Sequence, residues 1–284
     1  MQQEYRAAGL DWLAVWREMY DAEREQGEQA TASGFHVGAD YWAGQADRFA
    51  AAARRSPQPD PFLQRVLAQL RPTDTVMDIG AGSGRYLPYL ARACAHVVAV
   101  EPSPAMRGHL ERRIADERLE NVSVLPASWP APDAPPCDVA ISAHVVYAVR
   151  EIGPFLQHMD AVARRACFLY LAIRHPASFI SPLWERFHGQ PRRPLPGALE
   201  CLCALHQLGI PASLDLVPAT SRIAFADEAE ALADVRFRLR FPPDPRRDAE
   251  IREVVRATFE RDADGALLPP GQPAALAVIH WSKA

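Results

Sequence analysis

The sequence predicts an α/β protein built on a doubly wound, mostly parallel sheet that carries a helical cap. Between residues 73 and 175, short apolar runs alternate with longer amphipathic segments, the order that produces a parallel sheet with helices on both faces. The first run, Thr75 to Ile79, leads directly into a turn with glycine at 80, 82 and 84. The 284 residues, 49% hydrophobic and 23% charged, suffice for one large domain plus a cap.

Helices are expected where apolar residues recur at helical spacing between proline-rich or glycine-rich breaks. Ahead of the first strand they cover 8–27, 39–54 and 62–70. Short apolar runs then predict strands at 75–79, 96–100, 122–125, 137–142 and 167–173. Beyond residue 175 we expect a helix containing Trp184 and Phe187, helices at 196–208, 226–235 and 246–261, and strands at 213–217 and 275–281.

The stretch between Thr220 and Leu268, about 48 residues, is too long for a hairpin loop, which normally has about 2–5 residues. We therefore expect a helical cap there, and N-terminal helices beside it over the glycine-rich end of the sheet. The predicted division is an N-terminal lid at 1–61, a core at 62–219, a cap at 220–268 and a final core strand at 269–284.

The glycine-rich turn carries the strongest indication of a ligand. Glycines 80, 82 and 84 allow positive φ and let a ligand approach the main chain, and Asp78 lies where open α/β sheets bind ligands. A dinucleotide fold wants a small residue three positions after the second glycine, but Arg85 stands there. The acidic strand end followed by G-x-G-x-G instead resembles the first motif of the class I S-adenosylmethionine-dependent methyltransferases.

A second carboxylate supports this resemblance. Glu101 ends the next strand 23 residues after Asp78, close to the offset of about 20 at which doubly wound folds place a ribose-binding acid. Ser103 can cap the helix that follows, and proline at 104 is tolerated in its first turn. The run from Glu101 to Met106 resembles the second motif of the family, which lines the adenosine.

Two further segments resemble the family less closely or only in one branch. After the third strand the family commonly has an aspartate that holds the adenine amine. This chain has Ser128 and Trp129 there, which can supply a weaker acceptor and an apolar face. After the fourth strand, Ala143 and His144 resemble the histidine-containing turn of the small-molecule branch. In that branch a tyrosine ahead of the first strand often touches the methionine end, which points to Tyr41.

The resemblance, over residues 73–175, implies a Rossmann-like sheet of seven strands with an antiparallel last strand. It implies S-adenosyl-L-methionine as cofactor and S-adenosyl-L-homocysteine as product. The implied cofactor-binding residues are Tyr41, Asp78, Gly80, Ala81, Gly82, Gly84, Glu101, Pro102, Met106, Ser128, Trp129, Ala143 and His144.

Methyl transfer from a sulfonium needs alignment of donor and acceptor, and a general base when the acceptor is an O–H or S–H group. His144 is the candidate base, and Tyr147 is a candidate for the acceptor pocket. Packing remains the alternative for both. Arg236, Arg238 and Arg240 would form a basic face on a strand, either as a solvated surface with carboxylate partners or as an anion site.

Net charge and sequence motifs predict which kinds of molecule the protein binds. A net charge of −4 and the absence of Asn/Asp-Pro-Pro-aromatic after the fourth strand predict a small-molecule substrate and no nucleic acid. No apolar run is long enough to span a membrane. Five scattered cysteines are expected to be reduced in the cytoplasm, and no residue cluster has metal-binding spacing.

The predicted function is an S-adenosylmethionine-dependent methyltransferase (EC 2.1.1.-) that acts on a small-molecule acceptor through an undetermined O, N, C or S atom. The alternative is a non-catalytic methyltransferase-like protein that binds S-adenosylmethionine or a partner. A nicotinamide-dependent oxidoreductase is disfavoured by Arg85.

Overall fold

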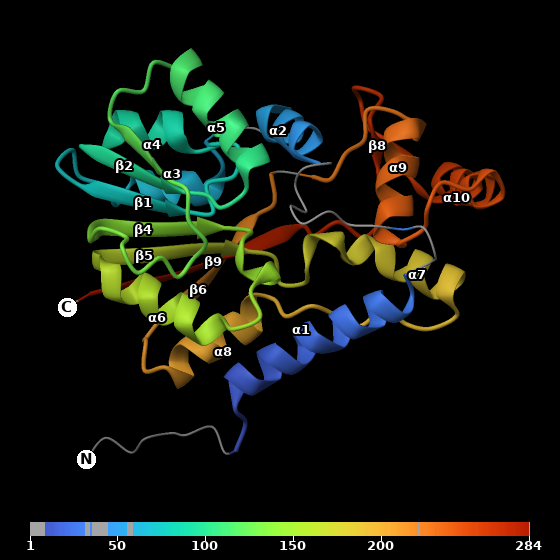
Figure 1. Cartoon of the computed structure of the whole chain (residues 1–284), viewed down its shortest axis with the longest axis horizontal. Coiled ribbons are helices and arrows are strands. Elements are labelled where there is room, and N and C mark those ends of the chain that lie inside the picture. Colours follow the sequence, from blue (N-terminus) through green and yellow to red (C-terminus); the bar gives the residue numbers. More distant parts are fainter. Residues whose placement is uncertain (1–8, 32–34, 36–44, 56–58, 221, 284) are drawn as a thin grey trace.

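The computed structural model describes residues 9–31, 35, 45–55, 59–220 and 222–283. Seven strands form one sheet in the order β3-β2-β1-β4-β5-β9-β6 (Figure 1). Their bounds are β1 Thr75–Ile79, β2 His96–Val100, β3 Val122–Leu125, β4 Cys137–Ala143, β5 Ala163–Leu171, β6 Ser213–Pro218 and β9 Ala275–Ser282.

The sheet is parallel from β3 to β5, and β9 runs antiparallel to both β5 and β6. The prediction of a seven-stranded, mostly parallel Rossmann-like sheet with an antiparallel last strand is confirmed. The strand order reverses beside β1, where Asp78 is in register with Ala99 of β2 and Ile141 of β4. Folds of this kind bind ligands at such a switch point, outside the carboxyl ends of the strands.

Helices cover both faces of the sheet, with α4 and α5 on one side and α6 and α8 on the other (Figure 1). Side chains cap several of them, as predicted for Ser103, whose hydroxyl accepts from Met106 N–H at 3.2 Å. The helices are α1 Trp12–Gln29, α2 Ala46–Arg55, α3 Pro61–Leu67, α4 Leu87–Ala93, α5 Pro104–Asp116, α6 Ile152–Val162, α7 Ser181–His188, α8 Ala198–Gln207, α9 Glu228–Arg238 and α10 Pro245–Thr258, with 3-10 turns η1 Val146–Ala148 and η2 Pro176–Ile180.

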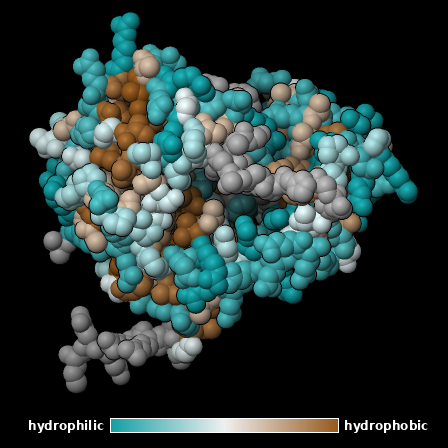
Figure 2. All heavy atoms as spheres, in the orientation of Figure 1, coloured by the Kyte–Doolittle hydropathy of each residue, from teal (hydrophilic) through white to brown (hydrophobic). Residues whose placement is uncertain are grey.

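A second hydrophobic cluster lies beyond the carboxyl ends of the strands, where Figure 1 shows α7, α9 and α10. It joins Phe179 and Trp184, from η2 and α7, to Leu232, Ile251 and Leu267 farther along the chain. Side chains on this face of the molecule are mostly hydrophilic over these helices, whereas hydrophobic residues gather over the sheet (Figure 2). None of the helices in the described ranges has the length and apolarity to cross a bilayer.

Three segments differ from the sequence predictions. Arg236 and Arg238 do not lie on a strand, because α9, capped by Asp227, continues to Arg238. The fifth strand begins earlier and ends earlier than 167–173, since β5 pairs with β4 from Ala163. A two-stranded ribbon, β7 (Glu260–Arg261) with β8 (Leu267–Leu268), was not predicted, because strands of two residues leave no periodic pattern.

Candidate active site

The glycine-rich turn is held against the end of β2. The backbone N–H groups of Gly80 and Ala81 both donate to Val100 O, at 2.8 and 3.0 Å. Gly80 has φ +74°, and a Cβ added there would lie 2.4 Å from Val145 Cγ2. Glycine is therefore required at position 80 by the packing of the turn, in addition to its backbone conformation.

At Gly82, by contrast, an added Cβ would have room. Its φ is +57°, and the nearest atom to an added Cβ is Phe49 Cε1 at 4.0 Å. Its N–H donates to Glu101 Oε2 at 2.8 Å, while Glu101 Oε1 accepts from Ser103 N–H at 2.9 Å. The Glu101 carboxylate thus lies where the turn after β1 meets the turn after β2, and it is only 5% exposed. This arrangement leaves open space at Gly82 beside a fixed hydrogen-bond acceptor.

Asp78 is the second buried carboxylate at this edge and is 2% exposed. Burial, and then the charge of Glu101, raise the pKa of Asp78 to about 7, while the charge of Arg85 opposes the rise. An acid with this pKa is half-ionised near neutral pH. A cationic ligand group placed here would favour its charged form.

Arg85 follows the last glycine of the turn but points to the start of α3. Its guanidinium forms an ion pair with Asp60, whose side chain is fully buried, and Tyr86 Oη donates to the same carboxylate oxygen at 2.9 Å. Because this pair is internal to the fold, Arg85 replaces the small residue of a dinucleotide fold without disturbing the turn. Asp60 precedes Arg85 by 25 positions, so no local pattern predicts the pair.

His144 follows Ala143, the last residue of β4, and has φ +60°. Its N–H donates to Tyr170 O at 2.9 Å, and its ring centroid is 4.9 Å from that of Tyr170. Tyr147 Oη lies 3.5 Å from His144 Nδ1. Burial, with a smaller effect of the Arg85 charge, lowers the pKa of His144 to about 3. The imidazole is therefore neutral at physiological pH.

Aromatic contacts extend from His144 toward the cap. Tyr147 Oη accepts from Ala172 N–H, and the Tyr147 ring meets His175 edge-on with centroids 4.9 Å apart. Burial, followed by the charges of Arg192 and then Arg238, lowers the pKa of His175 to about 3. The side chains of His144, Tyr147 and His175 thus lead from the carboxyl edge of the sheet toward Arg192 and Arg238.

The other predicted binding residues are less closely grouped. Met106 is buried in the first turn of α5, and Pro102 beside it is exposed. Ser128 is exposed, whereas the indole N–H of Trp129 donates to a backbone carbonyl of α6 at 3.1 Å. Tyr41 lies outside the described residues. For these side chains, cofactor contact stays a prediction.

Helix α2 contacts both α5 and α9, and the sequence indicates this helix only through its amphipathic pattern. Asp47 Oδ1 lies 2.9 Å from His109 Nε2 of α5. The next residue, Arg48, forms an ion pair with Asp234 of α9 at 2.5 Å. Phe49 lies closest to the open side of the glycine-rich turn. No spacing rule could have found Asp47 and Arg48, because both partners are distant in sequence.

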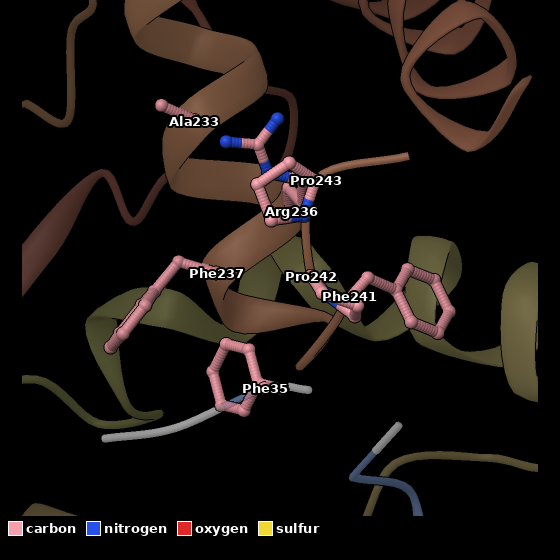
Figure 3. Close-up of a pocket in the computed structure, with 7 residues that line it drawn as sticks. All are labelled: Phe35, Ala233, Arg236, Phe237, Phe241, Pro242 and Pro243. Carbon is pink, nitrogen blue, oxygen red and sulfur yellow. The ribbon is translucent and has the colours of Figure 1, made fainter. Parts of the chain in front are cut away.

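A separate pocket of about 270 Å³ lies in the cap, and Figure 3 shows aromatic rings and a guanidinium around it. Its Arg236 is held by Asp248 at 2.8 Å, so this arginine already has a carboxylate partner. The lining residues are Phe35, Ala233, Arg236, Phe237, Phe241, Pro242 and Pro243. None of them belongs to the predicted cofactor site, so this pocket is distinct from the sheet edge.

Comparison with known proteins agrees with this geometry. Residues 77–171 match a family model described as a methyltransferase domain. A protein from Bacillus halodurans C-125 that is assigned as a methyltransferase has the same fold, with a TM-score of 0.53 at 11% identity over 78% of this chain and 96% of that one. Residues 77–171 therefore carry a methyltransferase domain, in agreement with the predicted class I S-adenosylmethionine-dependent methyltransferase, and S-adenosylmethionine is the cofactor of this class.

Two curated relatives share a shorter segment. A probable ribosomal RNA small subunit methyltransferase A of Methanosarcina acetivorans is 36% identical over 83 residues, which is 28% of this chain and 30% of that protein. A probable dimethyladenosine transferase of Dictyostelium discoideum is 32% identical over 83 residues, 29% of this chain and 26% of that protein. The match thus spans less than a third of the length of either relative.

The names of these relatives correct one prediction. The sequence predicts a small-molecule substrate and excludes nucleic acid, and that exclusion is wrong, because the matching curated proteins are named as ribosomal RNA and dimethyladenosine methyltransferases. The exclusion depended on the net charge of the whole chain, −4, which does not report how charge is distributed locally, and on the absence of a single motif, Asn/Asp-Pro-Pro-aromatic, after the fourth strand.

Proposed function

We propose that this protein transfers a methyl group from S-adenosylmethionine to an acceptor held between the carboxyl edge of the sheet and the cap. The observation that carries the proposal is the contact of Glu101 Oε2 with Gly82 N–H, 2.8 Å long. This contact joins Glu101, a carboxylate of the kind that binds a ribose, to Gly82. Gly82 is the one glycine of the turn whose added Cβ would have no close neighbour. Both features suit a nucleoside with an attached amino-acid chain.

The bound cofactor would supply a methyl group already activated by a sulfonium charge. In our proposal Glu101 accepts hydrogen bonds from the ribose hydroxyls, and the main chain at Gly80 to Gly84 borders the homocysteine portion. Asp78, with its raised pKa, gains a cationic partner and ionises. These residues hold the donor in one orientation, which is the main requirement of an in-line displacement.

His144 is proposed to orient the acceptor. A pKa of about 3 keeps its imidazole neutral, so it can exchange hydrogen bonds with the acceptor. The same value makes it a weak general base, because an efficient base has a pKa near the working pH. Tyr147 supports His144 through the contact between Oη and Nδ1. We therefore propose an acceptor that needs positioning more than deprotonation.

The cofactor site is tested by calorimetry with S-adenosylhomocysteine. Glu101→Ala removes a charged hydrogen-bond partner, which typically costs about 1.5–3 kcal/mol, so the affinity should fall roughly 10- to 150-fold. Glu111→Ala, at an exposed position on α5, is the matched control and should bind as the unmodified protein does. An unchanged dissociation constant in Glu101→Ala would place the ribose elsewhere.

The acceptor class is tested by transfer of a labelled methyl group from S-adenosylmethionine. One arm offers ribosomal RNA, the substrate that the relatives' names suggest. The other offers small phenols, thiols, amines and carboxylates, in line with the finer hypothesis from the small-molecule branch. Binding of S-adenosylhomocysteine without transfer in either arm would favour the alternative, a non-catalytic S-adenosylmethionine-binding protein.

A cytoplasmic location is proposed on the state of the cysteines. All five are free, and four of them are buried. Burial raises the pKa of the Cys94 thiol to about 11 and that of Cys137 to about 12, which keeps both protonated and unreactive. Fractionation of cells expressing the tagged protein would test this location.

A further inference from the structure

Phe49 is an aromatic side chain of α2 that borders the glycine-rich turn and is 46% exposed. The alanines at positions 46, 50 and 53 of the same helix are buried. Cε1 of Phe49 is the nearest atom to a Cβ added at Gly82, at 4.0 Å. The ring therefore lies at the edge of the open space beside Gly82, where the cofactor is proposed to bind.

The two residues that precede Phe49 hold α2 on both sides. Asp47 Oδ1 lies 2.9 Å from His109 Nε2 of α5, and Arg48 forms an ion pair with Asp234 of α9 at 2.5 Å. Figure 1 shows α2 between α5 and α9 accordingly. The Asp234 side chain is 1% exposed, so the contact with α9 is anchored inside the cap. The position of Phe49 is thus set by both the core and the cap.

The covalent structure of the cofactor indicates which of its atoms would lie near Phe49. In the proposed function, Glu101 binds the ribose and the main chain at Gly80 to Gly84 borders the homocysteine portion. The sulfur is bonded both to the ribose 5′-carbon and to the homocysteine chain, so it lies where these two parts meet. Gly82 N–H donates to Glu101 Oε2 at 2.8 Å, which brings the two binding elements together. Phe49, opposite Gly82, borders this junction.

We propose that the Phe49 ring contacts the sulfonium of S-adenosylmethionine and thereby favours the charged donor over its neutral product. The inference rests on the proposed function, because it requires the cofactor beside Gly82. The face of an aromatic ring attracts a cation through its quadrupole. Methyl transfer removes the positive charge from sulfur, and the thioether of S-adenosylhomocysteine keeps only the weaker contact of a neutral sulfur with a ring. The same ring therefore favours release of the product after transfer.

The test compares the dissociation constants of S-adenosylmethionine and S-adenosylhomocysteine by calorimetry. Both are measured at one fixed pH, because Asp78 has a pKa of about 7 in the same site. Phe49→Leu should weaken S-adenosylmethionine binding relative to S-adenosylhomocysteine binding by roughly 3- to 30-fold. Leucine remains apolar, so any lost contact area affects both ligands alike and cancels in the ratio of the two constants. Phe49→Tyr keeps the ring and should keep the ratio of the unmodified protein.

Phe187→Leu is the matched control, since it makes the same replacement at a partly buried position of α7 in the second hydrophobic cluster. It should leave the ratio unchanged. An unchanged ratio in Phe49→Leu, or an equal loss in Phe49→Tyr, would overturn the role of Phe49 while leaving the proposed function intact. Failure of the unmodified protein to bind either ligand would refute the proposed function itself.

A second variant tests whether α2 positions the ring. Arg48→Gln removes the ion pair with Asp234 and should lower the same ratio, because it frees the helix from the cap. In the Phe49→Leu background it should cause no further change, since there is no ring left to position. An unchanged ratio in Arg48→Gln, or an additional fall in the double variant, would overturn this positioning by α2.

Discussion

Replacing Asp78 by asparagine should stabilise the cofactor-free protein at neutral and alkaline pH. Asp78 is 2% exposed, and burial with the nearby Glu101 charge raises its pKa from 3.8 to about 7. A raised carboxyl pKa means that folding favours the protonated form. Its contribution to stability is therefore full below pH 3.8 and is lost as pH rises toward 7. Asparagine has nearly the same shape and never ionises, so it avoids this loss.

The size of the effect follows from the shift. Each pKa unit corresponds to about 1.4 kcal/mol, so ionisation of Asp78 destabilises the folded state by about 4 kcal/mol above pH 7. Between pH 5 and pH 8, the free energy of unfolding of Asp78→Asn should rise relative to the unmodified protein by roughly 2–3 kcal/mol. Urea unfolding at pH 5, 6, 7 and 8 measures this difference, and subtraction removes the titration of all other groups.

A matched control is Asp116→Asn, which makes the same replacement at an exposed position at the end of α5. The reasoning about Asp78 is refuted if the Asp78→Asn difference does not widen with pH, or if this variant is the less stable protein at pH 8. The same substitution should weaken S-adenosylhomocysteine binding, because the cationic ligand loses the charge it would balance. Stability and binding would then change in opposite directions, as is common at functional sites.

Three other predictions follow from the geometry. Gly80→Ala should lower the free energy of unfolding by about 2–4 kcal/mol, because the added Cβ meets a side chain at 2.4 Å. Gly82→Ala should lower it by only about 1 kcal/mol in urea unfolding but should weaken S-adenosylhomocysteine binding. Equal losses of unfolding free energy in the two variants would contradict this contrast. The imidazole NMR signals of His144 should stay those of the neutral ring from pH 5 to 8, and a titration in that range would disprove the lowered pKa. The buried hydroxyl of Tyr170 has no hydrogen-bond partner among the residues that the structure describes. Tyr170→Phe should therefore leave stability unchanged or raise it by about 1–3 kcal/mol, and a clear loss in urea unfolding would reveal a partner.

The geometry of the carboxyl edge of the sheet could be predicted because its signals are local. The strand Thr75–Ile79, the glycines after it and Glu101 at the end of β2 follow each other closely, and chain spacing translates directly into position in a doubly wound sheet. Ser103 was identified as a helix cap for the same reason. These predictions needed only the period of a strand, the conformation of glycine and the rule for the carboxyl edge.

The contacts made by the segments outside the matched domain could not be predicted, because they join distant parts of the chain. Asp234 faces Arg48 from 186 positions away, and Arg192 faces Glu23 from 169. The alternation of Arg238 and Arg240 with apolar residues indicated a strand, but packing of α9 against the second hydrophobic cluster favoured a helix. Local pattern gives way to tertiary packing when a short segment is compatible with both structures.

The extent of the family match also determines what the relatives can say about the substrate. The matched domain ends at residue 171, ahead of His175, Arg192, Arg238 and Arg240. A match confined to this segment supports the cofactor class but leaves the acceptor open, because resemblance of a fold does not determine the substrate. The net charge of −4 misleads for a related reason, since it is a sum over the whole chain and does not show where the charges lie. The acceptor of this protein therefore has to be identified by methyl-transfer assays that offer ribosomal RNA and small molecules side by side.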